Sequence, residues 1–261
     1  MEYTMTSLKN KIVFITGASA GIGAASAQAF AQEGAKLLLA ARRREKLQAM
    51  QEPLLKAGAA AIHTLELDVR DRHAVEQSVT SLPQEWKLID VLINNAGLSR
   101  GLDKVQEANP DDWDVMIDTN IKGLLYVTRA VLPGMVERQS GHIINMGSTA
   151  GELAYPGGSV YCGTKAAERL ITDGMRIDLL RTSIRVTSID PGAVMTDFSL
   201  VRFGGNQARA AKVYEGITPL SPEDIARTIV WAASQPEHVN ISRVLITSTD
   251  QANSLVFHRR S

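Results

Sequence analysis

A tyrosine and a lysine four residues apart, Tyr161 and Lys165, form the pattern in this chain best suited to chemistry. If their segment is helical, the two side chains share one face. A free tyrosine has a pKa of about 10, and a nearby ammonium favours the phenolate and brings that value toward the working range. Ser148 could donate a hydrogen bond to the same substrate oxygen. These residues predict a general acid/base, although the pair alone fits a solvated surface helix better.

A glycine-containing turn follows the first apolar run of the chain. It reads Thr16-Gly17-Ala18-Ser19-Ala20-Gly21-Ile22-Gly23, which departs from the Gly-x-Gly-x-x-Gly fingerprint. Glycines at a strand-to-helix turn let the backbone approach a pyrophosphate, and the helix start favours negative charge. The alternative is a tight turn with no ligand. We expect a dinucleotide to be bound by Gly17, Ser19, Gly21, Ile22 and Gly23.

Arginines follow the second apolar run, which reads Ala40-Ala41-Arg42-Arg43-Arg44-Glu45. A carboxylate at this place would bond the ribose 2′-hydroxyl, whereas an arginine pairs with a 2′-phosphate, often bidentately. Arginine is unfavourable beside a helix N-terminus, which argues against a mere solvated helix start for Arg42 and Arg43. The pattern therefore predicts NADP as the cofactor, with Arg44 facing solvent.

Two further turns end predicted strands, where an open α/β sheet binds its ligand. Asp68, followed by Val69, could hydrogen-bond the adenine amino group. The run Asn94-Asn95-Ala96-Gly97 would let the chain pass beside the adenosine, the alternative being a simple Asn-rich turn. We place at the cofactor Asp68, Val69, Asn94, Ala96 and Gly97.

Short apolar runs alternate with helix-like segments along the chain. The expected strands are 11–16, 35–41, 62–69, 89–94, 142–146, 184–189 and 243–248. The expected helices are 21–33, 44–56, 72–82, 111–137, 160–181 and 221–234. Runs that are apolar throughout indicate strands buried on both faces, as in a parallel sheet. The alternation predicts a doubly wound α/β fold, with seven parallel strands and helices on both faces, in one domain spanning 1–261.

Three local features refine these expectations. Pro53 is expected to end or kink the second helix, because proline lacks the backbone N–H. Ser221 is a possible cap for the last helix, with Pro222 near its start. The segment 193–219 is polar and contains glycine, so we expect a long irregular loop that serves function.

Composition narrows the possible classes of protein. The chain has 261 residues and a formal net charge of +0, which argues against nucleic acid as a partner. Cys162 is the only cysteine, so no intrachain disulfide can form and a reducing compartment is expected. The five histidines show no metal-ligand spacing, and no apolar run has the length of a membrane helix. Residues 1–10 show no export signal. We expect a cytoplasmic protein without a metal.

Together these elements resemble the classical subgroup of the short-chain dehydrogenase/reductase family over nearly the whole chain. The supporting motifs are Thr16-Gly17-x-x-x-Gly21-x-Gly23, Asp68, Asn94-Asn95-Ala96-Gly97, Asn120, Ser148, Tyr161-x-x-x-Lys165, and Pro191-Gly192 with Thr196. The resemblance implies a Rossmann fold, a nicotinamide cofactor and a catalytic set of Asn120, Ser148, Tyr161 and Lys165.

The resemblance also implies roles for individual residues. Lys165 and Tyr161 would lie at the nicotinamide ribose, and Asn120 would position a water that links Lys165 to solvent. The alternative for Asn120 is a structural amide. The carboxamide would be fixed by Pro191, Gly192, Val194 and Thr196.

Within the family the chain is similar to the NADP-dependent 3-hydroxy acid dehydrogenases, which include serine and L-allo-threonine dehydrogenases. The matching segments are 116–120, 128–133, 141–145, 198–203 and 257–259. The alternatives are a broad-specificity carbonyl or 3-oxoacyl reductase, and a non-catalytic NADP-binding regulator. The complete catalytic set disfavours the regulator. Two helices, 111–137 and 160–181, resemble those that join subunits in the family and imply a homotetramer.

A 3-hydroxy acid would bring a carboxylate close to the reacting carbon, and burying that charge needs a cation or several donors. Arg202, in the long loop, is the first choice. Arg100, where the family has a smaller residue, and Arg259, in a tail that could reach a neighbouring subunit, are the others. Ser148 would contact the substrate oxygen. The alternative for each arginine is a solvated surface position.

Overall fold

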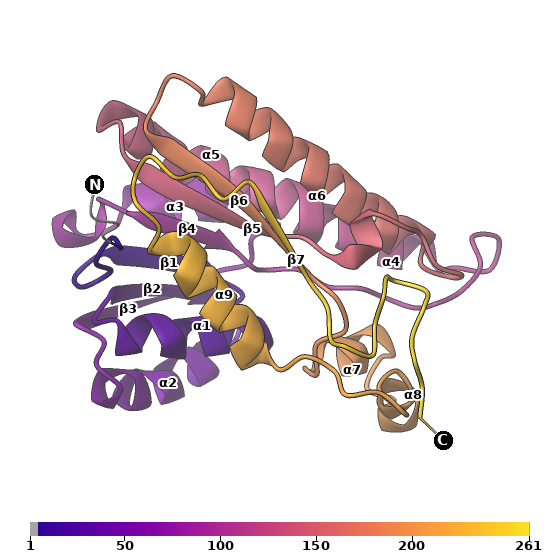
Figure 1. Cartoon of the computed structure of the whole chain (residues 1–261). Coiled ribbons are helices and arrows are strands. Elements are labelled where there is room, and N and C mark those ends of the chain that lie inside the picture. Colours follow the sequence, from indigo (N-terminus) through magenta and orange to yellow (C-terminus); the bar gives the residue numbers. More distant parts are fainter. Residues whose placement is uncertain (1–4, 261) are drawn as a thin grey trace.

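The computed structural model describes residues 5–260, which form one seven-stranded parallel sheet flanked by helices (Figure 1). Its strands are β1 (Ile12–Thr16), β2 (Lys36–Ala41), β3 (Ala61–Glu66), β4 (Val91–Asn94), β5 (Gly141–Met146), β6 (Ile184–Pro191) and β7 (Arg243–Ile246). They lie in the order β3-β2-β1-β4-β5-β6-β7, and each neighbouring pair is parallel. The sheet confirms the predicted doubly wound fold.

The central strands are buried on both faces because successive side chains point to opposite sides of the sheet. In β1, Val13 and Ile15 belong to one hydrophobic cluster, whereas Ile12 and Phe14 belong to the other. A strand between two such layers is apolar at nearly every position, which explains why apolar runs located the sheet.

Helices cover both faces (Figure 1). On one face the packing helices are α1 (Gly21–Gln32), α2 (Arg44–Lys56) and α9 (Pro222–Ala233), which supply Phe30, Leu47 and Ile225 to the first cluster. On the other face they are α3 (Arg72–Thr80), α5 (Leu124–Glu137) and α6 (Ser159–Asp178), which supply residues such as Val75 and Val127. Two short 3₁₀ turns, η1 (Gln84–Trp86) and η3 (Thr149–Gly151), complete the connections.

The expected single helix over 111–137 is interrupted. It consists of α4 (Pro110–Ile117), a π-helical turn η2 (Asp118–Gly123) and α5. Gly123 ends the π turn against Val69, whose Cγ2 would lie 2.6 Å from a Cβ at that glycine. A π turn of this kind is a local insertion within a helix, and such turns recur at functional sites.

The expectation that 193–219 is irregular throughout is wrong, because this segment contains α7 (Phe198–Arg202) and α8 (Gln207–Lys212). Both helices are too short to show an amphipathic period, and Gly204 and Gly205 separate them in a left-handed conformation, with φ of 59° and 92°. Asn206 caps α8 by accepting a hydrogen bond from the backbone N–H of Arg209.

The expected capping of α9 is confirmed. Ser221 accepts from the backbone N–H of Asp224, and the Asp224 carboxylate accepts from the backbone N–H of Ser221. Pro53, in contrast, does not end α2, which continues to Lys56. The Pro53 carbonyl still accepts from the backbone N–H of Ala57 at 3.0 Å, so the last turn forms without the missing donor.

Within residues 5–260, no helix is both long and apolar enough to cross a membrane. The first four residues of the segment 1–10, in which the sequence predicts no export signal, lie outside the described residues.

Candidate active site

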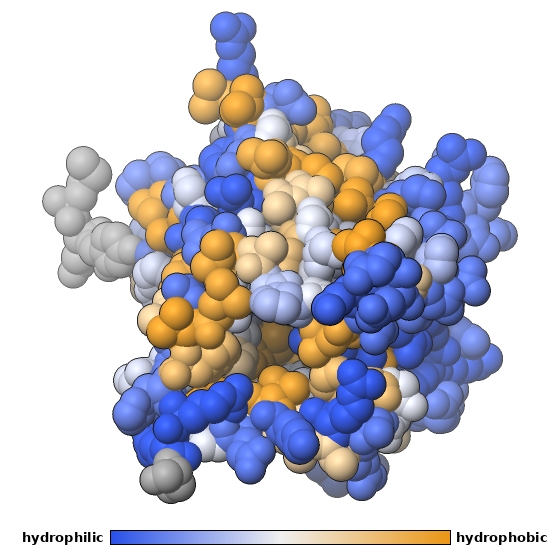
Figure 2. Space-filling view, turned by 90° about the vertical axis from the view of Figure 1, so that its right-hand side faces the viewer, coloured by the Kyte–Doolittle hydropathy of each residue, from blue (hydrophilic) through white to orange (hydrophobic). Residues whose placement is uncertain are grey.

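A cavity of about 490 Å³ opens at the carboxyl ends of the strands. The chain places β2 and β3 on one side of β1 and the later strands on the other, so the connections diverge between β1 and β4. An open α/β sheet binds its ligand at such a switch point. Figure 2 shows this end of the molecule, with a hollow bordered by hydrophobic side chains near the middle of the view.

The glycine turn after β1 forms one wall of the cavity. Gly17 and Gly21 have positive φ values of 65° and 53°, which glycine adopts without strain. A Cβ at Gly17 would lie 2.9 Å from Asn95 Nδ2. Gly17, Ser19, Gly21 and Ile22, which the sequence predicts to bind the cofactor, line the cavity, so the glycines keep the backbone close to the space that a pyrophosphate would occupy.

Gly23 serves packing instead. It is not among the residues that line the cavity, and a Cβ there would lie 2.4 Å from the Gly17 carbonyl oxygen. Helix α1 begins after Ala20, whose side chain cannot cap it, so no N-cap side chain accepts from the first backbone N–H groups of the helix. A helix N-terminus of this kind is suited to binding an anion.

The rim of the cavity carries positive charge. Arg42 and Arg43 line it at the end of β2, and Arg43 Nη2 donates to Ser19 Oγ at 3.0 Å. Asp68 and Val69 also line it, but Arg70 binds the Asp68 carboxylate, with Nη2–Oδ2 at 2.6 Å. Hydrogen bonds from Arg70 lower the pKa of Asp68, and the charge of Arg42 adds to this effect.

Ser148, Tyr161 and Lys165 line the same cavity opposite the glycine turn. Ser148 follows β5 and accepts from the backbone N–H of Ala150, which fixes the start of η3. Tyr161 and Lys165 lie one turn apart on α6, and each residue is 7% exposed. The structure therefore brings the predicted acid/base pair and its serine together.

Two hydrogen bonds fix the ammonium group of Lys165. Its Nζ donates to the Met146 carbonyl at 2.6 Å and to Glu168 Oε2 at 2.7 Å. Burial by itself would lower the pKa of Lys165, but the Glu168 carboxylate opposes this, and the net pKa is raised. An ammonium at this place keeps its charge, which favours a phenolate beside it.

Two predicted asparagines have their side-chain amides in the protein interior and are not among the residues that line the cavity. Asn120, in the π turn, accepts from Leu98 N–H at 2.9 Å and donates to the Leu98 carbonyl and to Thr164 Oγ1. Asn94 donates to Thr128 Oγ1 and Asn145 Oδ1, both at 2.9 Å. Ala96 and Gly97, which follow Asn94, do line the cavity.

The far end of the cavity is formed by the end of β6 and the chain after it. The four residues predicted to fix the carboxamide all line it, namely Pro191, Gly192, Val194 and Thr196. A Cβ at Gly192 would lie 2.1 Å from Gln251 Oε1, and the same oxygen accepts from the backbone N–H of Ala193 at 2.8 Å. The C-terminal segment thus holds this wall in place.

Of the three arginines considered for the substrate, only Arg202 contacts the predicted catalytic group. Its guanidinium carbon lies 5.2 Å from the centre of the Tyr161 ring and 5.1 Å from that of Phe198, and its Nη2 donates to the Tyr155 hydroxyl at 2.9 Å. Its buried Nε has no hydrogen-bond partner among the described residues. Arg202 lies just outside the residues that line the cavity, next to Val201, which does line it.

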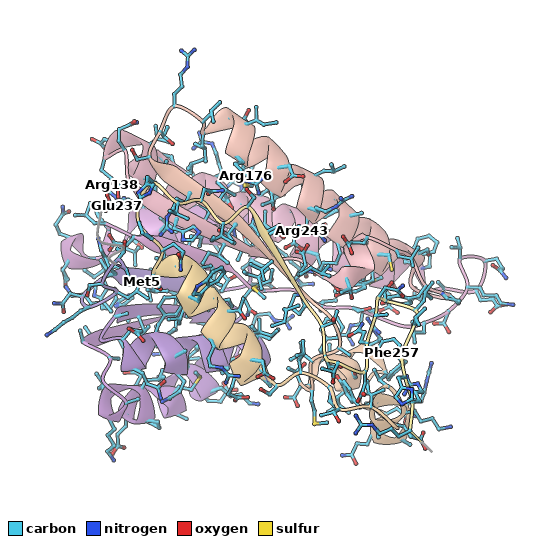
Figure 3. The ribbon with its side chains drawn as sticks, viewed as in Figure 1. Met5, Arg138, Arg176, Glu237, Arg243 and Phe257 are labelled. Carbon is cyan, nitrogen blue, oxygen red and sulfur yellow. The ribbon has the colours of Figure 1, made fainter. Side chains whose placement is uncertain are left out.

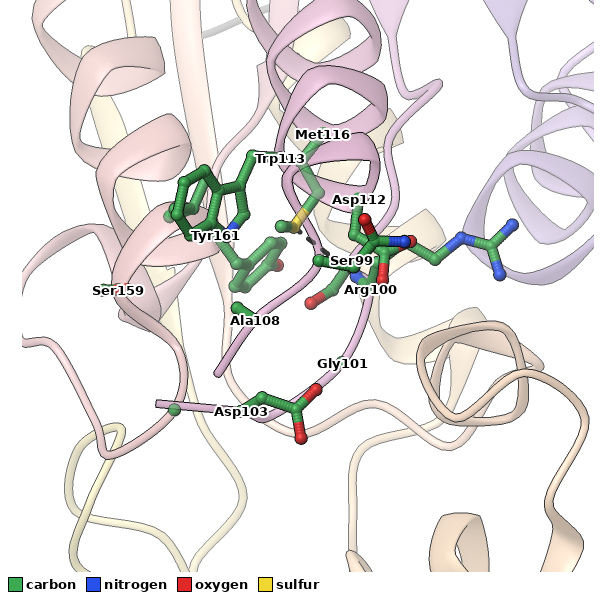
Figure 4. A pocket seen from close by; sticks show the side chains of 13 residues that line it. Ser99, Arg100, Gly101, Asp103, Ala108, Asp112, Trp113, Met116, Ser159 and Tyr161 are labelled. Carbon is green, nitrogen blue, oxygen red and sulfur yellow. Dashed lines mark hydrogen bonds between the residues drawn. The ribbon is translucent and has the colours of Figure 1, made fainter. Parts of the chain in front are cut away.

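The other two arginines point elsewhere. Arg100 donates to the Val201 carbonyl at 3.1 Å, and Figure 4 shows its side chain turned away from Tyr161. The hydrogen bond drawn there joins the Arg100 backbone N–H to Met116 Sδ. Arg259 donates to the backbone carbonyls of Val213 and Glu215, so the tail packs on its own chain.

Residues that the sequence reasoning missed complete the site. Phe198, Leu200 and Val201, on α7, line the cavity, and they fall in the segment expected to be irregular. Asn95 supports the glycine turn through its amide, which donates to the Thr16 and Gly17 carbonyls. Glu168 was also missed, although a carboxylate one turn after Lys165 on a helix face could have drawn attention.

A family model described as short chain dehydrogenase matches residues 11–203. The chain belongs to the short-chain dehydrogenase family. The predicted catalytic serine, tyrosine and lysine all lie within the matched region, at the cavity already described.

Individual relatives show which members of the family the chain is similar to. The NADP-dependent 3-hydroxy acid dehydrogenase of Salmonella typhi is 50% identical over 250 residues, which cover 95% of this chain and 99% of that protein. Sulfoacetaldehyde reductase 2 of Chromohalobacter salexigens is 44% identical over 242 residues, covering 92% and 95%. The closed form of serine dehydrogenase complexed with NADP⁺ superposes with a TM-score of 0.89 at 46% identity, covering 96% and 100%. The predicted similarity to 3-hydroxy acid and serine dehydrogenases is confirmed.

Proposed function

We propose that the protein is an NADP-dependent oxidoreductase that transfers a hydride between NADP(H) and the 3-hydroxyl or 3-keto carbon of a small 3-hydroxy acid, such as serine or L-allo-threonine. The observation that carries the proposal is one cavity that joins Ser148, Tyr161 and Lys165 to a rim containing Arg42 and Arg43. The names of the similar dehydrogenases support both the cofactor and the substrate class.

The residues present fit NADP. A side chain at Gly17 or Gly21 would contact neighbouring atoms. With glycine at both positions, the backbone of the turn can lie close to a pyrophosphate. Arg42 and Arg43 would hold the 2′-phosphate, because β2 ends without the carboxylate that would repel it. The wall from Pro191 to Thr196 would hold the nicotinamide.

When bound, the cofactor supplies the hydride chemistry, and the protein supplies position and electrostatics. In the oxidation direction, Tyr161 as phenolate accepts the proton of the substrate hydroxyl. Ser148 orients and polarises the same oxygen, and the Lys165 ammonium favours the phenolate. The side-chain hydrogen bonds of Asn120 fit the structural-amide alternative, since they hold Leu98 and Thr164. The role of Asn120 in positioning a water stays a prediction.

The substrate carboxylate is assigned to Arg202. Its guanidinium lies over the Tyr161 ring, so a carboxylate paired with it would place its neighbouring carbons beside the tyrosine. Sulfoacetaldehyde carries a sulfonate. A similar protein that is named as a reductase of this compound also supports a site that accepts a small anion. A carbonyl reductase acting on such anions is the second candidate function.

The test is a comparison of substrates with purified protein. With NADP⁺, we expect kcat/KM for serine, L-allo-threonine and 3-hydroxypropanoate to exceed that for neutral alcohols of similar size, and NAD⁺ to be the poorer cofactor. With NADPH, sulfoacetaldehyde tests the second candidate. Turnover of neutral alcohols alone would contradict the assignment to acids, and tight NADP⁺ binding with no turnover of any substrate would favour the regulator.

We also propose a homotetramer in the cytoplasm, with the whole chain acting as one domain. Apolar side chains are exposed on α6, where Leu170 is 65% and Ile177 is 73% exposed, and separately on α9 and β7, at Trp231 and Leu245. Two distinct self-complementary faces are what a tetramer with dihedral symmetry needs. Light scattering after gel filtration tests this assembly, and a monomer of wild-type protein would contradict it.

A further inference from the structure

Glu168 is a buried carboxyl group that the mechanism above does not use. It lies one turn after Lys165 on α6, and its side chain is only 2% exposed. Its Oε2 accepts from Lys165 Nζ at 2.7 Å, whereas its Oε1 is buried without any hydrogen-bond partner among the described residues. A carboxylate with one unpaired buried oxygen is costly, and gaining a proton relieves that cost.

The charges around Glu168 come from several elements. Lys165 and Tyr161 share α6 with it, and Asp190 approaches from β6. Arg243, on β7 and labelled in Figure 3, pairs with Asp190 and with Glu152. Burial raises the pKa of Glu168 to about 7, although Lys165 opposes the shift.

The Lys165–Glu168 contact limits what Lys165 can offer to the cavity. The ammonium has three N–H donors, and Met146 and Glu168 take two of them. A carboxylate at 2.7 Å also cancels much of the ammonium field outside the pair, whereas a neutral carboxyl group leaves it nearly intact. The charge state of Glu168 therefore governs how strongly Lys165 acts on Tyr161.

We propose that Glu168 is a positioning residue that anchors Lys165 and, by gaining or losing one proton, sets how strongly the Lys165 ammonium favours the phenolate of Tyr161. This rests on the proposed roles of Tyr161 and Lys165. Each step balances, since one proton passes between the Glu168 carboxyl group and solvent, while the charge of Asp190 still favours the Lys165 ammonium. Ionised Glu168 opposes the phenolate, so its removal should let the phenolate form at lower pH.

The experiment is the pH dependence of kcat/KM for oxidation of the best substrate. Glu168→Gln removes the charge and keeps the shape, and Glu168→Met removes it with an apolar side chain of similar length. We expect both variants to move the acidic limb of the profile to lower pH by on the order of one unit. Asp173→Asn is the matched control, because Asp173 is an exposed carboxylate on the same helix that pairs with Arg176. It should leave the limb in place.

Three outcomes would overturn the proposal. They are an unchanged limb in a folded Glu168 variant, a limb moved to higher pH, and a uniform loss of kcat/KM at every pH. The limb can be measured with any alcohol that the enzyme oxidises, so failure of the 3-hydroxy acid assignment does not prevent the test.

A second readout needs no substrate. An unfolded Glu168 ionises near pH 4.5 and the folded one near pH 7, so this group makes stability fall as the pH rises between these values. In Glu168→Gln, the urea midpoint should therefore fall less than in wild type as the pH rises through this range. A wild-type slope retained in Glu168→Gln would contradict the buried titration.

Discussion

The guanidinium carbon of Arg202, at the end of α7, lies 5.2 Å from the centre of the Tyr161 ring on α6. This contact places a fixed positive charge beside the group that is proposed to exchange the substrate proton. A cation on the face of an aromatic ring is stabilised by the ring electrons. The proposed role of Arg202 is therefore to hold the substrate carboxylate beside Tyr161.

Arg202→Ala tests this link. Losing a charge-assisted bond of about 1.5–3 kcal/mol should raise KM for serine-like acids roughly 10- to 100-fold. KM for a neutral secondary alcohol should change far less. Steady-state kinetics with both substrate types separate the two effects, and Arg100→Ala is the control because that guanidinium binds the Val201 carbonyl. An equal rise for both substrates would mean that Arg202 only shapes the aromatic cluster.

Changing both Arg42 and Arg43 to alanine should weaken the preference for NADPH over NADH. Removing the cations that face the 2′-phosphate should raise KM for NADPH by about tenfold or more, while KM for NADH changes little. The next arginine, Arg44, is exposed and absent from the cavity lining, so Arg44→Ala is the matched control. Equal losses with both cofactors would count against phosphate recognition.

Lys165→Ala should shift the pH optimum for oxidation upward and weaken NADP⁺ binding. Without the ammonium, the phenolate of Tyr161 loses a cation that favours it, although the Arg202 guanidinium remains beside the ring, and the buried Glu168 takes up a proton. The pH–rate profile of the residual activity measures the first effect, and a fluorescence titration measures the second. Lys122→Ala, which removes an exposed lysine paired with Asp118, should change neither. An unmoved profile would exclude the electrostatic role of Lys165.

His142 should make the protein sensitive to acid. Burial and the charge of Arg185 lower the pKa of His142 well below its ordinary value of 6.5. The unfolded chain therefore binds this proton first, so stability is present above about pH 6.5 and is lost as the pH falls below it. In His142→Asn, the urea midpoint should depend less on pH in this range. The exposed His73 provides the control variant, His73→Asn, which should keep the wild-type slope.

The parts of the fold that the sequence predicted share one physical cause. A strand buried on both faces is mostly apolar, so β1, β2, β4 and β5 could be located from their apolar runs, although β5 also contains the buried polar residues His142 and Asn145. The glycine turn after β1, which forms one wall of the cavity, was predictable because glycines between a first strand and a helix are typical of dinucleotide binding. Ser148, Tyr161 and Lys165 followed from their spacing and from the family resemblance.

Other features depend on contacts that no local pattern encodes. The π turn at Asn120 and the short helix α7 lack a period of their own, so the segment with Phe198 was taken for an irregular loop. The sequence favoured Arg202 over Arg259 only because Arg202 lies in the long loop, and the fold placed one beside Tyr161 and the other on backbone carbonyls. Burial of Glu168 likewise depends on the packing around α6.

The most direct test of the account compares wild type with Tyr161→Phe in NADP⁺ reduction by the best 3-hydroxy acid, alongside NADP⁺ binding. The phenylalanine ring fills the same space but holds no transferable proton, so kcat should fall about 10²–10⁴-fold. The NADP⁺ dissociation constant should stay close to that of wild type, and Tyr126→Phe, on α5, should keep full activity. Wild-type kcat in Tyr161→Phe, or a wild-type protein that reduces no NADP⁺ with any 3-hydroxy acid, would contradict the account.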